Sequence, residues 1–134
     1  MERPDERSDA RERALYLLYE AHSKGIDPAD TIDLQVIEPD RLTQELVRGV
    51  AEHAADIDER IGTRAKGWTL SRMPVLDLNV MRLGTYELAH RPEVPTAVVL
   101  DEAVKLAKRF STDDSGRFVN GVLAAVARDV RDVG

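Results

Sequence analysis

The segment VLDLNVMRLGTYELA, residues 75–89, constrains the fold more than any other part of the sequence. Its apolar residues occupy more than one face of a helix, with Leu76, Val80 and Leu83 on one face and Leu78, Met81 and Leu88 on others. A helix that is apolar on several sides is stable only when other helices surround it. We therefore expect this segment to form the central helix of a bundle.

The same helical spacing recurs through most of the chain, and no segment alternates for long enough to predict a sheet. Gly25 is well placed to end a first helix, and residues 26–40 read as a loop. Further helices are expected over 39–61, with a bend near Gly49, over 96–110, and from about residue 114 onward, with a short element after Thr69. The prediction is an all-α, compact bundle of about six or seven helices.

Composition excludes several classes of protein. The chain has 134 residues, is 43% hydrophobic and contains no cysteine, so it can bury one core but cannot form disulfides or thiolate metal sites. The N-terminal residues MERPDERSDARER are too charged for a signal peptide, and no apolar run approaches the length of a membrane span. We expect a soluble, cytoplasmic protein that does not enter a membrane.

The charge is unevenly distributed. The net charge of −6 argues against a protein that coats nucleic acid by charge alone. Between Arg60 and Arg91, however, the sequence contains six basic residues and only two acidic ones. Charge therefore leaves open a local basic face on an acidic protein, although such a run is more often a solvated helix surface.

No segment has the spacing of a catalytic, phosphate-binding or metal-binding motif. GTRAKGWT has two glycines at P-loop distance but lacks the lysine and hydroxyl pair that must follow. His22, His53 and His90 are far apart in sequence, and STDDS lacks the ligand spacing of a calcium loop. We expect a binding protein that is not an enzyme, without metal or other cofactor.

The segment STDDSGRFVNGVL, residues 111–123, allows two interpretations. In the structural one, its acids and Ser115 cap the unpaired N–H groups of a helix, and Phe118 packs beneath a neighbouring helix. In the functional one, Arg117, Phe118 and Asn120 bind single-stranded RNA by phosphate pairing, base stacking and hydrogen bonds. Gly121 costs the helix roughly 1 kcal/mol against alanine, which is easiest to understand if either another backbone or a ligand approaches closely there.

Three segments resemble the NusB family of bacterial transcription antitermination factors. VPTAVVLDEAVKLAKRFSTDDSGRFVNGVL, residues 94–123, closely resembles the C-terminal signature of the family. WTLSRMPVLDLNVMRLGTYEL, residues 68–88, resembles its central helix and ends in the family's pattern of Arg82, Tyr86, Glu87 and Leu88. ARERALYLLYEA, residues 10–21, is similar to its first helix, so the resemblance covers nearly the whole chain.

The resemblance implies a helical RNA-binding domain without catalysis, divided into halves of about 8–66 and 67–132. Members of the family bind the boxA element of nascent RNA, as in ribosomal RNA leaders, together with NusE, a ribosomal small-subunit protein. The assembly helps RNA polymerase pass terminators. By position, the resemblance implies RNA-facing roles for Tyr19, Asp114 and Phe118 and a NusE-facing role for Asp77.

The N-terminal arm departs from the arginine-rich arm that is frequent in this family. Residues 1–13 carry four arginines and five acids, and only Arg7 and Arg11 lie where arm contacts to phosphate are expected. Because few phosphates would be neutralised, we expect weak, salt-sensitive RNA binding by the chain alone. NusE is then expected to contribute much of the affinity.

Two alternatives remain at this stage. A similar helical domain precedes some RNA cytosine methyltransferases, but we expect no such activity from a chain that has no cysteine and ends after its bundle. The second alternative is an interaction module that forms a homodimer through a helix face and does not touch RNA. Size measurements with RNA at several protein concentrations would separate these hypotheses.

Overall fold

The computed structural model describes residues 4–131, and it confirms the all-α prediction. No strand occurs among these residues, and one short 3₁₀ helix accompanies seven α-helices. The elements are α1 (Pro4–Lys24), α2 (Pro28–Asp33), α3 (Arg41–Glu52), α4 (Ala54–Arg64), η1 (Leu70–Arg72), α5 (Val75–His90), α6 (Thr96–Phe110) and α7 (Asp113–Val130).

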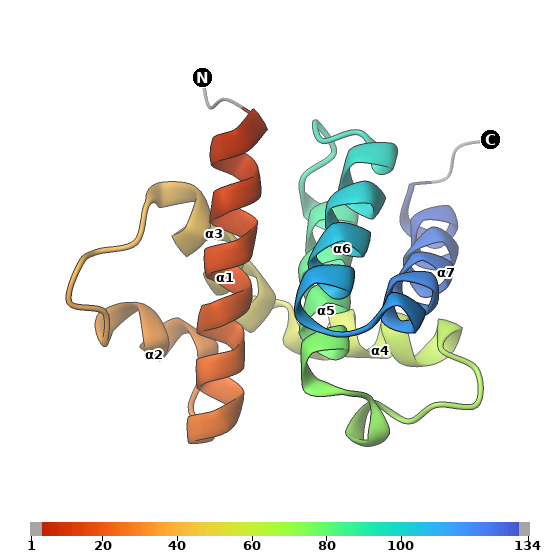
Figure 1. Ribbon diagram of the computed structural model, residues 1–134, viewed down its shortest axis with the longest axis horizontal. Helices are drawn as coiled ribbons and strands as arrows, with labels where there is room; N and C mark the ends of the chain where they lie inside the picture. The colour runs from red at the N-terminus through yellow and green to blue at the C-terminus, as the bar shows by residue number, and fades with distance from the viewer. Residues whose placement is uncertain (1–3, 132–134) are drawn as a thin grey trace.

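Helix α5 is the central element, as its sequence predicts. It packs against α1, α3, α4, α6 and α7, and most of its residues are buried (Figure 1). Two glycines allow this close packing. The ring of Tyr86 lies 2.2 Å from the position that a Cβ of Gly49 would take, and a methyl group of Leu123 lies 2.7 Å from that of Gly84. A side chain at position 49 would displace the Tyr86 ring, and one at position 84 would displace the buried Leu123 side chain.

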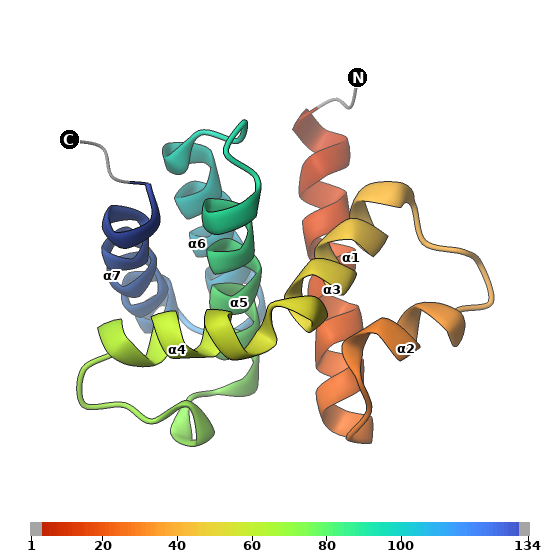
Figure 2. The same ribbon diagram turned by 180° about the vertical axis from the view of Figure 1, so that it is seen from behind.

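The helices gather into two groups. Helices α1, α2 and α3 pack on one another, whereas α4 packs on α5 and α7 and joins the other group. The chain passes between the groups at His53, where α3 ends and α4 begins (Figure 2). In place of the division near residue 66 that the family resemblance implies, we propose His53 as the boundary of the two halves, because α4 packs on the C-terminal group.

Several helix ends follow from local sequence. Gly25 takes a φ of +66° directly after α1, a conformation that favours glycine. Asp40 caps α3 by accepting from the backbone N–H of Thr43, so this helix begins after Pro39. The six-residue helix α2 lies in the segment that the sequence predicted as a loop, capped by the Asp27 side chain.

The C-terminal end of α7 is joined to the connection between α5 and α6. The Arg131 guanidinium donates hydrogen bonds to four backbone carbonyls, those of Glu87, Leu88, Arg91 and Val94. These carbonyls lie at the end of α5 and in the turn that follows, where helical hydrogen bonds run out. None of the helices in the described part of the chain is both long and apolar enough to cross a membrane.

Candidate RNA interface

The first turns of α7 form an exposed polar surface beside α6. Thr112 caps the helix by accepting from the backbone N–H of Ser115 at 3.0 Å. Asp114 and Arg117 form an ion pair in the open, with 86% and 75% of their side chains exposed. Asn120 is exposed as well and lines a shallow groove between α6 and α7 together with Arg117. The structure thus brings Asp114, Arg117 and Asn120 onto one accessible surface.

Gly121 is exposed on the same helix. No heavy atom lies within 4 Å of the position that its Cβ would occupy. Close approach of another part of the described chain therefore does not explain this glycine. An approaching ligand remains the functional explanation for it.

Phe118 is partly buried rather than freely exposed. It packs against the hydrophobic core, and its ring lies 5.7 Å from that of Trp68, centroid to centroid, at an interplanar angle of 53°. Phe118 therefore packs against the core on one side and exposes part of its ring on the other. Trp68, which the sequence analysis did not single out as a site residue, remains 49% exposed. The sequence feature that could have identified Trp68 as a site residue is its position in KGWTLSR, a short polar segment with two cations.

A second aromatic cluster lies between α1 and the end of α6. Tyr19 is 46% exposed, and Tyr16 beside it is 50% exposed. The Tyr16 ring meets Phe110 edge to face at 5.5 Å, and the Arg109 guanidinium lies 5.0 Å from the Phe110 ring centroid. Tyr19 is thus accessible for the expected RNA contact, whereas sequence reasoning missed Tyr16 and Phe110.

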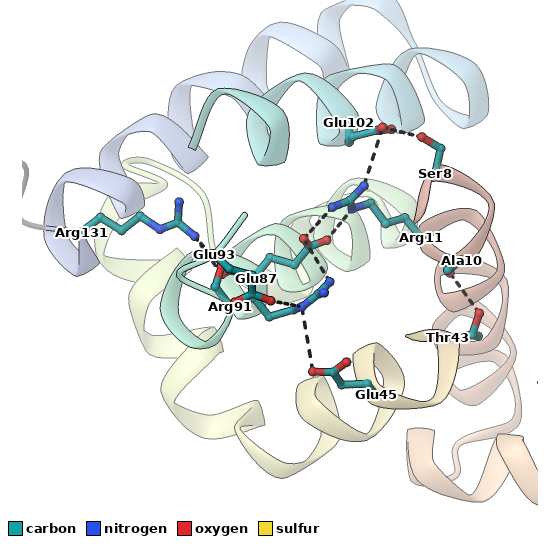
Figure 3. A network of polar contacts seen from close by, with 10 residues as sticks. All are labelled: Ser8, Ala10, Arg11, Thr43, Glu45, Glu87, Arg91, Glu93, Glu102 and Arg131. Atoms are coloured by element: carbon teal, nitrogen blue, oxygen red, sulfur yellow. Dashed lines mark hydrogen bonds and ion pairs between the residues drawn. The ribbon is translucent and has the colours of Figure 1, made fainter. Parts of the chain in front are cut away.

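Arg11 does not fit the predicted role in phosphate binding. It is only 3% exposed, and its guanidinium donates two hydrogen bonds to the Glu87 carboxylate, at 2.6 and 2.9 Å (Figure 3). The physical reason is its place on the buried stripe of α1, one turn before the fully buried Leu15. Arg7, one turn earlier, is partly exposed and remains a candidate for the arm contact.

The Arg11–Glu87 pair belongs to a network that joins three helices. The third Arg11 nitrogen, Nη1, lies 3.7 Å from the Glu102 carboxylate, which also accepts a hydrogen bond from the Ser8 hydroxyl. On the other side, Arg91 lies 3.8 Å from Glu87 (Figure 3). The network links α1, α5 and α6 through charges that are buried at its centre, so these residues hold the bundle together.

Asp77 also differs from its predicted role at a partner surface. It is 3% exposed, and its carboxylate accepts a hydrogen bond of 2.8 Å from the Ser115 hydroxyl. The Ser115 hydroxyl lies in turn 2.9 Å from that of Ser111 and 3.0 Å from that of Thr112. Asp77 therefore joins the start of α5 to the first turn of α7. It positions the exposed acids of that turn and is not itself available to a partner.

Tertiary packing brings together two histidines that are distant in sequence. The rings of His53 and His90 stack at a centroid distance of 3.9 Å, next to the ring of Tyr86. Partial burial and the neighbouring His53 imidazole hold the pKa of His90 below its ordinary value. Within the described residues, no cluster of histidine and acid side chains has an arrangement that could hold a metal ion.

The chain is similar in sequence and in structure to NusB proteins. A sequence model of the NusB family matches residues 8–128. The transcription antitermination protein NusB of Streptomyces avermitilis is 51% identical over 126 residues, 87% of this chain and 88% of the relative. The solved structure of T. maritima NusB superimposes with a TM-score of 0.85 at 32% identity, over 96% of this chain and 94% of that one.

A solved complex is also similar. It contains the antitermination factors NusB and NusE with double-stranded RNA, and its matching chain superimposes with a TM-score of 0.79 at 26% identity. The superposition covers 92% of this chain and 96% of that chain. The described helices are therefore arranged as in solved NusB structures.

Proposed function

The chain belongs to the NusB family of transcription antitermination proteins, and we propose that it binds the boxA element of nascent RNA together with NusE. Members of this family are transcription antitermination factors and not enzymes. The proposed complex acts on RNA polymerase in the cytoplasm, where nascent ribosomal RNA is made. It requires no cofactor.

The observation that carries the proposal is the exposed surface at the start of α7. Arg117 and Asn120 lie in the open there, and the partly buried Phe118 lies on the same turn of α7, with its ring directed toward Trp68. A cation, an amide and an aromatic ring are the groups that bind phosphate, base edges and base faces of single-stranded RNA. Support for RNA and NusE as partners also comes from the solved complex of a similar NusB with NusE and double-stranded RNA.

The proposed RNA contacts are revised by burial. We retain the accessible or partly accessible residues of the original set, namely Arg7, Tyr19, Asp114, Arg117, Phe118 and Asn120. Arg11 is assigned instead to the buried network that fixes α1 against α5. Asp77 is assigned to positioning the first turn of α7, so the NusE-facing surface has to involve other residues.

Charge explains why a protein partner is part of the proposal. Arg117 is already paired with Asp114, and the protein carries a net charge of −6. Few phosphates are neutralised by such a surface, so RNA affinity of the chain alone is weak and falls steeply with salt. NusE contributes additional contacts and raises the affinity of the complex.

The proposal is tested by fluorescence anisotropy of a labelled boxA RNA, titrated with the protein in the presence and absence of NusE. We expect tighter binding with NusE and weaker binding to a scrambled RNA of equal length. Phe118→Leu retains apolar packing but removes the ring, and is expected to weaken binding at least about 5-fold. Val98→Ala, at an exposed site near the start of α6 and beside the far end of α7, is the control. Absence of boxA binding under both conditions would contradict the proposal.

One observation favours a second candidate function. Leu34, Val36 and Ile37 are exposed in the segment between α2 and α3, with Val36 and Ile37 at 102% and 84%. Adjacent exposed apolar residues of this kind mark protein-interaction surfaces. If the chain is a dimerisation module, sedimentation will show concentration-dependent self-association that Ile37→Glu abolishes. A monomer at all concentrations argues against this function.

A further inference from the structure

Trp68 is the only tryptophan of the chain and one of its most exposed large apolar side chains. It lies between α4 and η1, directly after Gly67, which adopts a φ of +82°. Its backbone N–H donates to the carbonyl of Ala65 at 3.1 Å, which closes a tight turn. The turn presents the indole to solvent at 49% exposure instead of burying it in the nearby core. Local backbone geometry therefore fixes an exposed aromatic ring at this position.

The indole does not project freely, because it rests on α7. Its ring centroid lies 5.7 Å from that of Phe118, and Phe118 is packed in turn against the hydrophobic core. The two rings are tilted by 53°, an arrangement in which one ring supports the other. Phe118 thus anchors the pair, and Trp68 carries the larger part of its solvent-facing surface. Phe118 lies on α7, the helix that also presents Asp114 and Arg117.

The cations next to Trp68 are unusual for this protein. Lys66 and Arg72 are exposed, and neither forms an ion pair with any described residue. Neighbouring arginines differ, since Arg64 pairs with Asp129 and Arg82 with Asp58. Residues 65–74 contain these two cations and no acid, within a chain of net charge −6. The turn is a local positive segment that is complementary to phosphate.

We propose that Trp68 is a base-stacking residue for single-stranded RNA, that Phe118 positions it, and that Lys66 and Arg72 bind the adjacent phosphates. Lys66 is two residues from Trp68 and Arg72 is four. Their Cα atoms therefore lie at most about 7 Å and about 14 Å, respectively, from that of Trp68. That reach matches one or two nucleotides of an extended strand. Unpaired cations beside an aromatic ring favour RNA, because its phosphates would neutralise both cations. A protein partner would have to supply two acids for the same purpose. This inference rests on the proposed RNA-binding function and extends its site across the turn before α5.

The experiment uses the intrinsic fluorescence of the intact protein, because a single tryptophan reports on its own site. A boxA oligonucleotide is titrated into the protein, and Trp68 emission is compared with anisotropy of the labelled RNA. We expect saturable quenching with the same midpoint as the anisotropy change. An abasic oligonucleotide of equal length retains phosphates but cannot stack, so it should leave the emission nearly unchanged.

Variants separate stacking from folding. Trp68→Leu should weaken RNA binding by about 5- to 150-fold, while Trp68→Phe should retain most of the affinity. Lys66→Gln and Arg72→Gln should each reduce the slope of log affinity against log salt by about 1. Phe118→Leu should change the tryptophan emission of the free protein, because the ring that supports the indole is absent. Circular dichroism of each variant verifies that the helices remain folded.

The outcomes distinguish this inference from the proposed function. RNA binding with unchanged Trp68 emission and full affinity of Trp68→Leu would overturn the inference and leave the function intact. Emission that responds to NusE alone, with no response to RNA, would also overturn it and assign the turn to the protein partner. No RNA binding by anisotropy, with or without NusE, would refute the function itself and the inference with it.

Discussion

The buried Arg11–Glu87 pair yields the most discriminating test of the structural assignment. Replacing Arg11 by methionine keeps the length and apolar stem of the side chain but removes both hydrogen bonds to the Glu87 carboxylate. Glu87 is 2% exposed, so its charge cannot be hydrated once Arg11 is absent. Arg91, at 3.8 Å, compensates only in part. The change therefore leaves the buried Glu87 carboxylate without its main partner in the centre of the bundle.

The expected magnitude follows from this burial. Hydrogen bonds to charged groups contribute about 1.5–3 kcal/mol each, and removing one partner of a buried ion pair costs about 3–5 kcal/mol. We therefore expect Arg11→Met to lower the free energy of unfolding by about 3–5 kcal/mol. This is a large part of the roughly 5–15 kcal/mol that stabilises a typical domain. Combining it with Glu87→Met should recover much of the loss, because no unpaired charge then remains at that position.

Urea unfolding followed by circular dichroism measures all three variants, and the double-mutant cycle gives the coupling between the two residues. Arg13→Met is the matched control on the same helix. Arg13 pairs with Asp40 on the surface, with 56% and 44% of the side chains exposed, so its loss should cost less than about 1 kcal/mol. If Arg11→Met proved as mild as the control while weakening RNA binding, the structural assignment would be refuted and Arg11 would return to the RNA interface.

Three further predictions concern packing, the exposed helix face and pH. Gly84→Ala should destabilise the fold by about 1–3 kcal/mol in urea unfolding, because the new methyl group meets Leu123 at 2.7 Å; no loss would contradict the close contact of α5 and α7. Gly121→Ala has open space and should stabilise the helix by up to about 1 kcal/mol; weaker RNA binding in the same variant would locate the ligand there, and destabilisation would refute the description of this face. The pKa of His90 is lowered in the fold by partial burial and by His53, so the unfolded chain takes up the proton first as pH falls. Stability should therefore decrease as pH falls through about 6.5, and less so in His90→Gln; equal pH profiles for the two proteins would exclude this contribution.

The motif that ends the central helix has a structural explanation. Glu87 holds Arg11 through two hydrogen bonds, and Arg82 holds Asp58 of α4 in the same manner, at 2.9 and 3.0 Å. Tyr86 occupies the space that Gly49 leaves open. These three residues fix α1, α4 and α3 respectively against α5. Their role is to hold the bundle that supports the proposed RNA-facing surface.

The sequence predicted the fold correctly in segments whose apolar residues recur with a clear helical period. The central helix, the stop at Gly25 and the start of α7 depend on local spacing and capping, which the sequence contains directly. Helix α2 was missed because six residues are too few to display a helical period. The single long helix expected over residues 39–61 is divided at His53, where neither glycine nor proline marks the break.

The site was predicted less completely, since burial depends on contacts between distant segments. The family resemblance placed Arg11 in the RNA-binding arm and Asp77 at the NusE-facing surface, yet each is buried beside a partner far away in the chain, Glu87 and Ser115. Trp68 was missed for a similar reason, because only the folded chain places it on Phe118. Spacing within one helix identifies a face, but the identity of the neighbour decides whether that face is accessible.

Cross-linking of boxA RNA that carries 4-thiouridine tests the central claim most directly, since it maps the protein residues that RNA contacts in the complex with NusE. The account predicts cross-links to peptides that contain Trp68, Tyr19 and residues 114–120, with none to the exposed apolar segment 34–37. Cross-links confined to other surfaces, or formed equally well by a scrambled RNA, would contradict the assignment of the RNA-binding face to the start of α7.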